Sequence, residues 1–212
     1  MVQQIITTYT SPGDTVCDPN PGSGLLLAEV VRAGRKALGL LPTQVQWESF
    51  LEANLARLTG SVGTAALLDS ADDPRAAELP GAIDFVLTDL RHTPECDPSQ
   101  VLVDLYEDLD AVADWVWPGA HIVVTCRPWR RRGHLLDLHS EIHDVADAIG
   151  LIHENRAHPR IVTRTGTSPE RTDIHGHLTS HPAHLDVLVV RLPATCSAVF
   201  PNDDGRRRWR AA

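Results

Sequence analysis

The most informative stretch of this chain reads Asp14-Thr-Val-Cys-Asp-Pro-Asn-Pro-Gly-Ser-Gly24. A short apolar segment ends at Asp18, a turn rich in glycine and proline follows, and a second apolar segment begins near Ser23. This order predicts a strand, a tight turn and a helix, which together bring backbone N–H groups close to a ligand at the carboxyl end of the strand. No lysine follows the glycines, so the turn does not match a nucleoside-triphosphate P-loop.

The composition is that of an ordinary globular domain. The 212 residues are 42% hydrophobic and 22% charged, which is enough for one α/β domain with a full core. Acidic residues outnumber lysine and arginine by 28 to 19, and the net charge is -9. Binding to nucleic acid would therefore require a local basic patch.

The sequence contains no apolar run of the ~18 residues that a membrane span needs. The first nine residues have neither a basic start nor a long apolar stretch, so no signal peptide is predicted. The cysteines form no CxxC pair, and we expect reduced thiols in a cytoplasmic protein that does not bind membranes. They are Cys17, Cys96, Cys126 and Cys196.

Strand and helix patterns alternate along the chain. Apolar runs predict strands at 15–17, 36–41, 64–68, 83–88, 121–125, 160–163 and 185–191. Helical periodicity predicts helices at 25–33, at 43–58, from Asp97 onward, and at 137–149. Such alternation predicts an α/β fold with a mostly parallel seven-stranded sheet, helices on both faces and a C-terminal antiparallel strand pair. Residues 1–200 would form a single domain, with a disordered tail at 201–212.

The first 40 residues or so, from the strand ending in Asp18-Pro-Asn-Pro-Gly-Ser-Gly to the next strand, resemble the S-adenosylmethionine (AdoMet) motif of DNA amino-methyltransferases. Those enzymes methylate the exocyclic amine of cytosine or adenine. The resemblance implies a Rossmann-like methyltransferase fold and AdoMet as the cofactor. It also implies that the turn lines the methionine and ribose of AdoMet, through Asp18, Pro19, Gly22, Ser23 and Gly24.

A second match is Val86-Leu-Thr-Asp-Leu-Arg-His92, which occupies the place of the family's catalytic segment. The resemblance implies that Asp89 accepts N–H bonds from the target amine and that His92 replaces the aromatic ring that stacks on the flipped base. The family's two prolines are missing, because Leu90 and Arg91 stand there. The implied mechanism is direct methyl transfer by proximity and electrostatics, with no covalent enzyme intermediate.

Two further positions depart from the family pattern. Leu41 stands where an acid should accept the ribose hydroxyls, and Asn20 stands where an aromatic residue should follow Asp-Pro. After the third strand, Asp69 and Ser70 are candidates for hydrogen-bonding the adenine amine, although a solvated acidic loop explains them equally well.

A basic segment follows the fifth predicted strand and should share an edge of the sheet with Asp89. Its side chains, together with Arg91, are candidates for holding nucleic-acid phosphates, with Trp129 as a stacking face; a merely solvated surface is the alternative. The candidate arginines in it are Arg127, Arg130 and Arg131. DNA or RNA is the expected partner, with a homodimer mate or another protein supplying target recognition.

Other readings of the sequence remain open. No metal site is expected, because the histidines at 175, 177, 181 and 184 match no compact zinc spacing. RNA and a small molecule are the alternative substrates to a DNA amine. The altered catalytic segment also fits a non-catalytic descendant kept as a binding or scaffold module.

Overall fold

A computed structural model gives the structure of the protein. The structure describes residues 2–41, 45–58, 60, 62–93, 95–131, 134–153, 186–193, 196–201 and 207–211. Of these, residues 45–50, 153, 186, 196–201 and 207–211 are described by their backbone alone.

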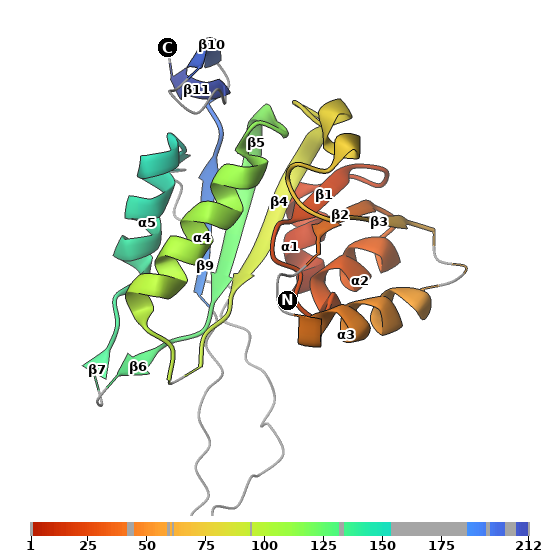
Figure 1. The fold of residues 1–212 in the computed structure, drawn as a ribbon, viewed down its shortest axis with the longest axis horizontal. Helices are drawn as coiled ribbons and strands as arrows, with labels where there is room; N and C mark the ends of the chain where they lie inside the picture. Colours follow the sequence, from red (N-terminus) through yellow and green to blue (C-terminus); the bar gives the residue numbers. More distant parts are fainter. Residues whose placement is uncertain are drawn as a thin grey trace, which may run out of the picture.

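A seven-stranded sheet forms the centre of the described structure (Figure 1). The five strands from β3 to β5 run parallel, and β9 is antiparallel to both of its neighbours. This architecture confirms the predicted α/β, Rossmann-like fold. In spatial order the strands are β3 (Thr64–Leu68), β2 (Lys36–Leu40), β1 (Thr15–Asp18), β4 (Ile83–Leu90), β5 (Val116–Cys126), β9 (Asp186–Arg191) and β8 (Ile152–His153).

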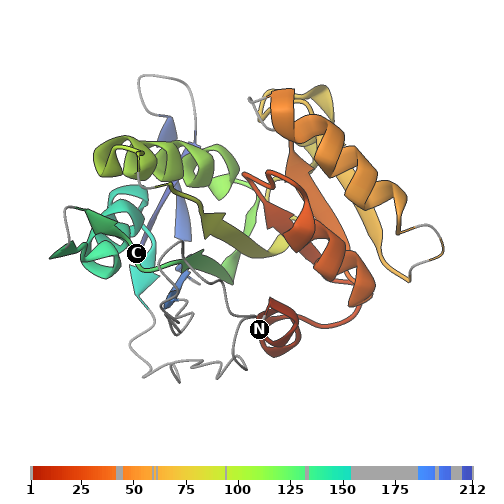
Figure 2. The ribbon, with the colours of Figure 1, turned by 90° about the horizontal axis from the view of Figure 1, so that it is seen from below.

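Helices pack on both faces of the sheet because its strands alternate in the direction of their side chains. In β4, Val86 packs into one buried cluster, whereas Phe85 and Leu87 pack into the other. The first cluster includes side chains of α4 (Pro98–Ala113) and α5 (Leu138–Ile149). The second includes side chains of α1 (Val2–Tyr9), α2 (Leu25–Arg32) and α3 (Val45–Ala56). Figure 2 shows α4 beside α5, and α2 beside α3.

Helix α1 is an element that the sequence reasoning did not predict. Its Ile5 and Ile6 are fully buried in the core. The ring of Tyr9 stacks on that of Phe85 from β4, with centroids 5.6 Å apart and an interplanar angle of 7°. The amino-terminal segment is therefore an integral part of the helical layer.

Arg35, in the turn between α2 and β2, attaches this helix to the rest of the domain. The side chain is buried, and its Nε donates to the hydroxyl of Thr10 at 3.0 Å. Its Nη2 donates to the carbonyl of Thr10 at 2.7 Å, and Nη1 donates to the carbonyl of Ala33.

Replacing Arg35 with methionine is expected to lower the free energy of unfolding by about 2–3 kcal/mol, because the buried carbonyl of Thr10 and the half-buried carbonyl of Ala33 lose their charged donor. Urea denaturation followed by circular dichroism measures the change. Lys36→Met, at an exposed neighbouring position, is the matched control and should change stability by less than about 0.5 kcal/mol. Equal losses in the two variants would contradict this role for Arg35.

The C-terminal part differs from the prediction. The strand expected at 160–163 lies outside the described residues, and the short strand β8 pairs with β9 instead. The tail was predicted to be disordered, yet Arg207–Ala211 forms strand β11 and pairs antiparallel with β10 (Cys196–Pro201). This pair is separate from the main sheet.

Within the described residues, no helix is long and apolar enough to cross a membrane. The same residues contain no group of three or more side chains arranged to hold a metal ion. The four histidines weighed as ligands, at 175, 177, 181 and 184, lie outside the described part.

Candidate active site

The glycine-rich turn joins the carboxyl end of β1 to the start of α2, as the sequence predicts. Gly24 is the N-cap of α2 and has φ +77, a conformation that favours glycine. A Cβ atom at Gly24 would lie 2.4 Å from Cδ1 of Leu51 in α3. The turn therefore packs directly against α3, where Asn54 also donates to the carbonyl of Ser23 at 2.7 Å. Pro19, between Asp18 and this turn, is buried.

Asp18 is a buried carboxylate with an unsatisfied oxygen. The residue is 1% exposed, and Oδ1 accepts the backbone N–H of Asn20 at 3.2 Å. Oδ2 is buried and has no hydrogen-bond partner among the described residues. Burial raises the pKa of Asp18 to about 7, against the opposing effects of the Arg91 charge, the Asn20 N–H and the nearby Thr88 hydroxyl. A buried acceptor of this kind is costly unless a ligand supplies its donor.

Arg91, Asn20 and Asp108 form a chain of hydrogen bonds across the turn. Nη2 of Arg91 donates to Oδ1 of Asn20 at 3.1 Å, and Nδ2 of Asn20 donates to Oδ2 of Asp108 in α4 at 2.8 Å. Burial raises the pKa of Asp108 to about 6, although the Asn20 hydrogen bond opposes that rise. Asn20 therefore links three elements through its amide.

The guanidinium of Arg91 lies directly over the turn. A Cβ atom built on Gly22, which has φ +49, would be only 1.4 Å from Nη1 of Arg91. A larger residue at position 22 would be strained at this φ and would push the flexible end of Arg91 away from the turn. The sequence placed Arg91 with the nucleic-acid contacts, whereas the structure places it against the predicted cofactor turn.

The residues of the predicted catalytic segment are held by the neighbouring strand. Oδ1 of Asp89 accepts the hydroxyl of Thr125 at 2.9 Å, and the two residues are paired in the β4–β5 ladder. The ring of His92 stacks on Trp129, with centroids 4.1 Å apart and an interplanar angle of 6°. Nε2 of His92 also lies 3.1 Å from the carbonyl oxygen of Arg127. His92 thus has one ring face covered by the protein itself.

The burial of Trp129 contradicts the prediction that this residue offers a stacking face to nucleic acid. The residue is only 2% exposed and belongs to the core cluster beneath α4 and α5. It cannot offer a free stacking face to a base, because its ring packs inside the protein. The polar neighbours in the sequence gave no sign of this burial.

The arginines around Trp129 remain at the surface, beyond the carboxyl end of β5. Arg127, Arg130 and Arg131 are all exposed. Arg131 pairs with Asp97, at the start of α4, over 3.2 Å. Because the parallel strands β1, β4 and β5 share a carboxyl edge, these arginines lie at the same edge of the sheet as Asp18 and Asp89.

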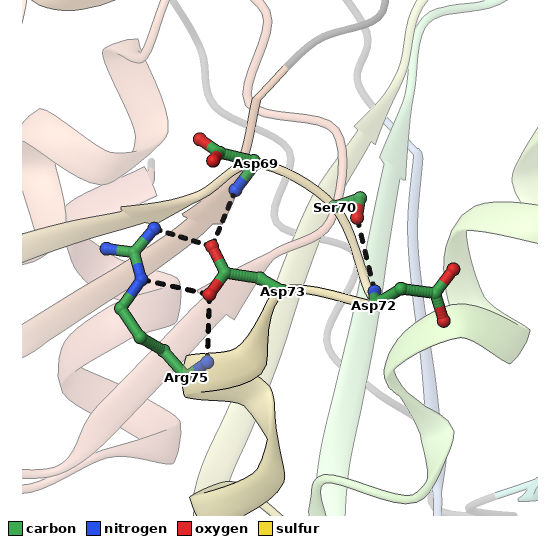
Figure 3. Close-up of polar contacts among 5 residues, drawn as sticks. All are labelled: Asp69, Ser70, Asp72, Asp73 and Arg75. Atoms are coloured by element: carbon green, nitrogen blue, oxygen red, sulfur yellow. Dashed lines mark hydrogen bonds and ion pairs between the residues drawn. The ribbon is translucent and has the colours of Figure 1, made fainter.

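The acidic loop after β3 is organised around Asp73, a residue that the sequence reasoning passed over (Figure 3). Asp73 is buried and accepts Nε and Nη2 of Arg75 at 3.0 and 2.6 Å, which holds the pKa of that carboxyl well below its usual range. It also accepts the backbone N–H of Asp69 at 3.1 Å. Asp73-Pro74 is a sequence signal for a helix start, and it caps the short helix η1 (Pro74–Glu78).

The two candidate adenine ligands, Asp69 and Ser70, are both exposed in this loop. The hydroxyl oxygen of Ser70 accepts the backbone N–H of Asp72 at 3.2 Å. In Figure 3 the carboxylate of Asp69 points away from Asp73 and Arg75. At the end of the neighbouring β2, Leu41 is partly buried against the helix-covered core and supplies no side-chain acceptor.

Comparisons with known proteins support the fold. No protein-family model matches the chain, and no curated protein sequence matches it. A SAM-dependent methyltransferase of Methanosarcina mazei is 13% identical with a TM-score of 0.55, over 90% of this chain and 98% of that one. A precorrin-6y C5,15-methyltransferase of Geobacter metallireducens is 14% identical with a TM-score of 0.53, over 89% of this chain and 87% of that one. A TehB-like SAM-dependent methyltransferase of Corynebacterium glutamicum is 12% identical with a TM-score of 0.51, over 91% and 86%. These similarities establish a Rossmann-like methyltransferase fold, and they are not specific to the DNA amino-methyltransferases.

Proposed function

We propose that this protein is an AdoMet-dependent methyltransferase that acts on an exocyclic amine, in the manner of the DNA amino-methyltransferases that its first 40 residues or so resemble. The observation that carries the proposal is the unpartnered Oδ2 of Asp18, buried where β1 meets the glycine turn. In open α/β sheets, ligands bind at the carboxyl ends of the strands.

Asp18, Gly22 and Asp69 suit the binding of AdoMet, whereas Leu41 does not. Asp18 would accept the ammonium of the methionine tail, and the turn at Gly22 lets backbone approach the ligand closely. The exposed Asp69 at the end of β3 would accept the adenine amine. Leu41 offers the ribose hydroxyls no acceptor, and each missing charged hydrogen bond costs about 1.5–3 kcal/mol. The affinity for AdoMet is accordingly expected to be modest.

In this proposal Asp89 is the catalytic residue. When bound, AdoMet supplies an electrophilic methyl group. A carboxylate has two oxygens, so Thr125 fixes the orientation of Asp89 through Oδ1 while Oδ2 accepts an N–H of the target amine. This hydrogen bond holds the amine nitrogen in line for transfer and favours the positive charge that develops on it. Exposed Arg127 and Arg130 at the same edge favour a polyanionic substrate, with DNA as the lead and RNA next.

Calorimetric titration with S-adenosylhomocysteine, the demethylated form of AdoMet, tests the cofactor site. Gly22→Ala adds a methyl group to the face of the turn where the ligand is proposed to lie and strains a residue with φ +49, so it is expected to weaken binding at least about tenfold, while the flexible end of Arg91 moves aside. Gly13→Ala is the matched control, because Gly13 has φ +93 and nothing within 4 Å of its Cβ position. Gly13→Ala strains the backbone as Gly22→Ala does, but it should bind S-adenosylhomocysteine as tightly as the wild type. No heat from the wild type at millimolar ligand would refute the proposal.

Transfer of a labelled methyl group to DNA, to RNA and to a small-molecule amine extract then separates the substrate classes. Asp89→Ala should abolish transfer and leave the calorimetric affinity unchanged, since Asp89 touches the amine rather than the cofactor tail.

A second candidate function is a non-catalytic binding module. It is favoured by the stacking of His92 on Trp129, in a segment that lacks the Pro-Pro turn. Ligand binding without transfer to any of the three substrate classes would identify this function.

A further inference from the structure

Arg91 has more hydrogen-bonding capacity than the structure uses. A guanidinium carries five N–H donors. The side chain is exposed and donates from Nη2 to a neutral amide, that of Asn20, at 3.1 Å. Asn20 is itself held by Asp108 at 2.8 Å, so the guanidinium is positioned over Gly22 by a residue that is fixed from α4.

Asp18 supplies the opposite charge at the same turn. Among the described residues its buried Oδ2 has no hydrogen-bond partner, although the Arg91 charge and the nearby Thr88 hydroxyl both act on the carboxylate. Within the described part of the chain, the turn is therefore flanked by a buried carboxylate oxygen without a hydrogen-bond donor and by a cation whose hydrogen bond goes to a neutral amide. A ligand that carries an ammonium and a carboxylate on neighbouring atoms complements this pair of charges.

We infer that Arg91 binds the α-carboxylate of the ligand's amino-acid tail while Asp18 binds its α-ammonium, so that the site selects a zwitterionic tail. This inference rests on the proposed AdoMet function and assigns Arg91 to the cofactor. The resembling family has proline at this position, so the recognition of the carboxylate by Arg91 is particular to this chain.

In the alternative role, Arg91 blocks the turn and must be displaced before the ligand binds. The contacts favour the role in which Arg91 binds the ligand carboxylate. A carboxylate accepts a guanidinium through charge-assisted, bidentate hydrogen bonds, which are roughly twice as strong as the bond to a neutral amide. The exposed Arg91 side chain can therefore exchange Asn20 for a ligand carboxylate with a net gain, without leaving the turn.

The test is calorimetry with two ligands that differ only in the carboxylate: S-adenosylhomocysteine and its decarboxylated amine. Arg91→Ala is expected to weaken S-adenosylhomocysteine about 10- to 100-fold and to leave the decarboxylated ligand within about twofold of the wild type. Arg91→Lys keeps the charge and loses the two parallel N–H donors of the guanidinium. Its affinity for S-adenosylhomocysteine should lie between those of the wild type and Arg91→Ala. Arg57→Ala, at an exposed arginine after α3, is the control and should bind both ligands normally.

The outcomes separate this inference from the proposed function. Wild-type binding of S-adenosylhomocysteine together with an Arg91→Ala variant that weakens both ligands by the same factor, or that binds S-adenosylhomocysteine as tightly as the wild type or more tightly, would overturn the role of Arg91 and leave the proposed function standing. A wild type that binds neither ligand would overturn both.

Discussion

Replacing Asp18 with asparagine is expected to raise the free energy of unfolding at pH 8 by about 2–4 kcal/mol. In the folded protein burial raises the pKa of Asp18 to about 7, whereas the unfolded chain ionises near 3.8. Between those values the folded state binds more protons than the unfolded state, so the stability of the wild type falls as the pH rises from about 4 to 7. Asparagine is neutral at every pH and avoids that loss, while its Oδ1 can still accept the Asn20 N–H.

Urea denaturation at pH 5 and pH 8 checks this result. At pH 5 the gain should fall to roughly 40% of its value at pH 8, because folded Asp18 is protonated there while the unfolded chain, which ionises near 3.8, is already mostly ionised. Asp108, whose pKa burial raises to about 6, stays in both proteins and leaves the variant with a shallower slope of the same sign. Asp72→Asn, at an exposed acid, should change stability by less than about 0.5 kcal/mol at either pH. A gain of equal size at pH 5 and pH 8 would contradict the assigned pKa.

The stabilised variant should also lose its affinity for S-adenosylhomocysteine. A group that destabilises the fold and sits at the end of a central strand is typical of a binding site, where the ligand offsets the cost. Stabilisation without loss of binding would mean that Asp18 does not contact the ligand.

Local signals in the sequence were enough to predict most of the central architecture. The glycines that end α2 and α5, at positions 34 and 150, both adopt the left-handed conformation that such positions favour. Asp137 caps α5 by accepting the N–H of Ser140, at the boundary that the sequence indicates. Strand order follows from alternation, because parallel strands need helical crossovers.

Helix α1 escaped prediction because little in its own sequence stabilises it. It has eight residues, fewer than an isolated helix needs in water. Its stability comes from Arg35 and Phe85, which lie 26 and 76 positions beyond its C-terminal residue, Tyr9. Interactions over such separations leave no periodic pattern in a sequence.

Long sequence separation also explains why the hydrogen bonds of the site could not be predicted. Asn20 and Asp108 are separated by 88 positions and Arg91 and Asn20 by 71, so the polar chain across the turn exists only after folding. From the sequence, Asn20 only marks the loss of the aromatic residue that follows Asp-Pro in the resembling family. In the folded chain this residue is the polar link between the turn, β4 and α4.

The largest loss of stability is expected at Trp129. Trp129→Ala should lower the free energy of unfolding by about 3–5 kcal/mol, because the side chain is buried and its removal leaves a cavity in the cluster beneath α4 and α5. The variant also removes the stacking partner of His92. Urea denaturation measures the loss, and a midpoint shift without a change in slope identifies it as one of stability.

Trp117→Ala provides the matched control on the same chain. Trp117 lies in β5 and is 61% exposed, so its truncation should cost less than about 1 kcal/mol. The sequence-based alternative, in which Trp129 stacks on a nucleic-acid base, makes the opposite prediction: Trp129→Ala would keep its stability and weaken single-stranded DNA binding by the ~1–3 kcal/mol typical of one stacked base. A large loss of stability in Trp129→Ala alone would show that this ring is part of the core and not a contact for a nucleic-acid base.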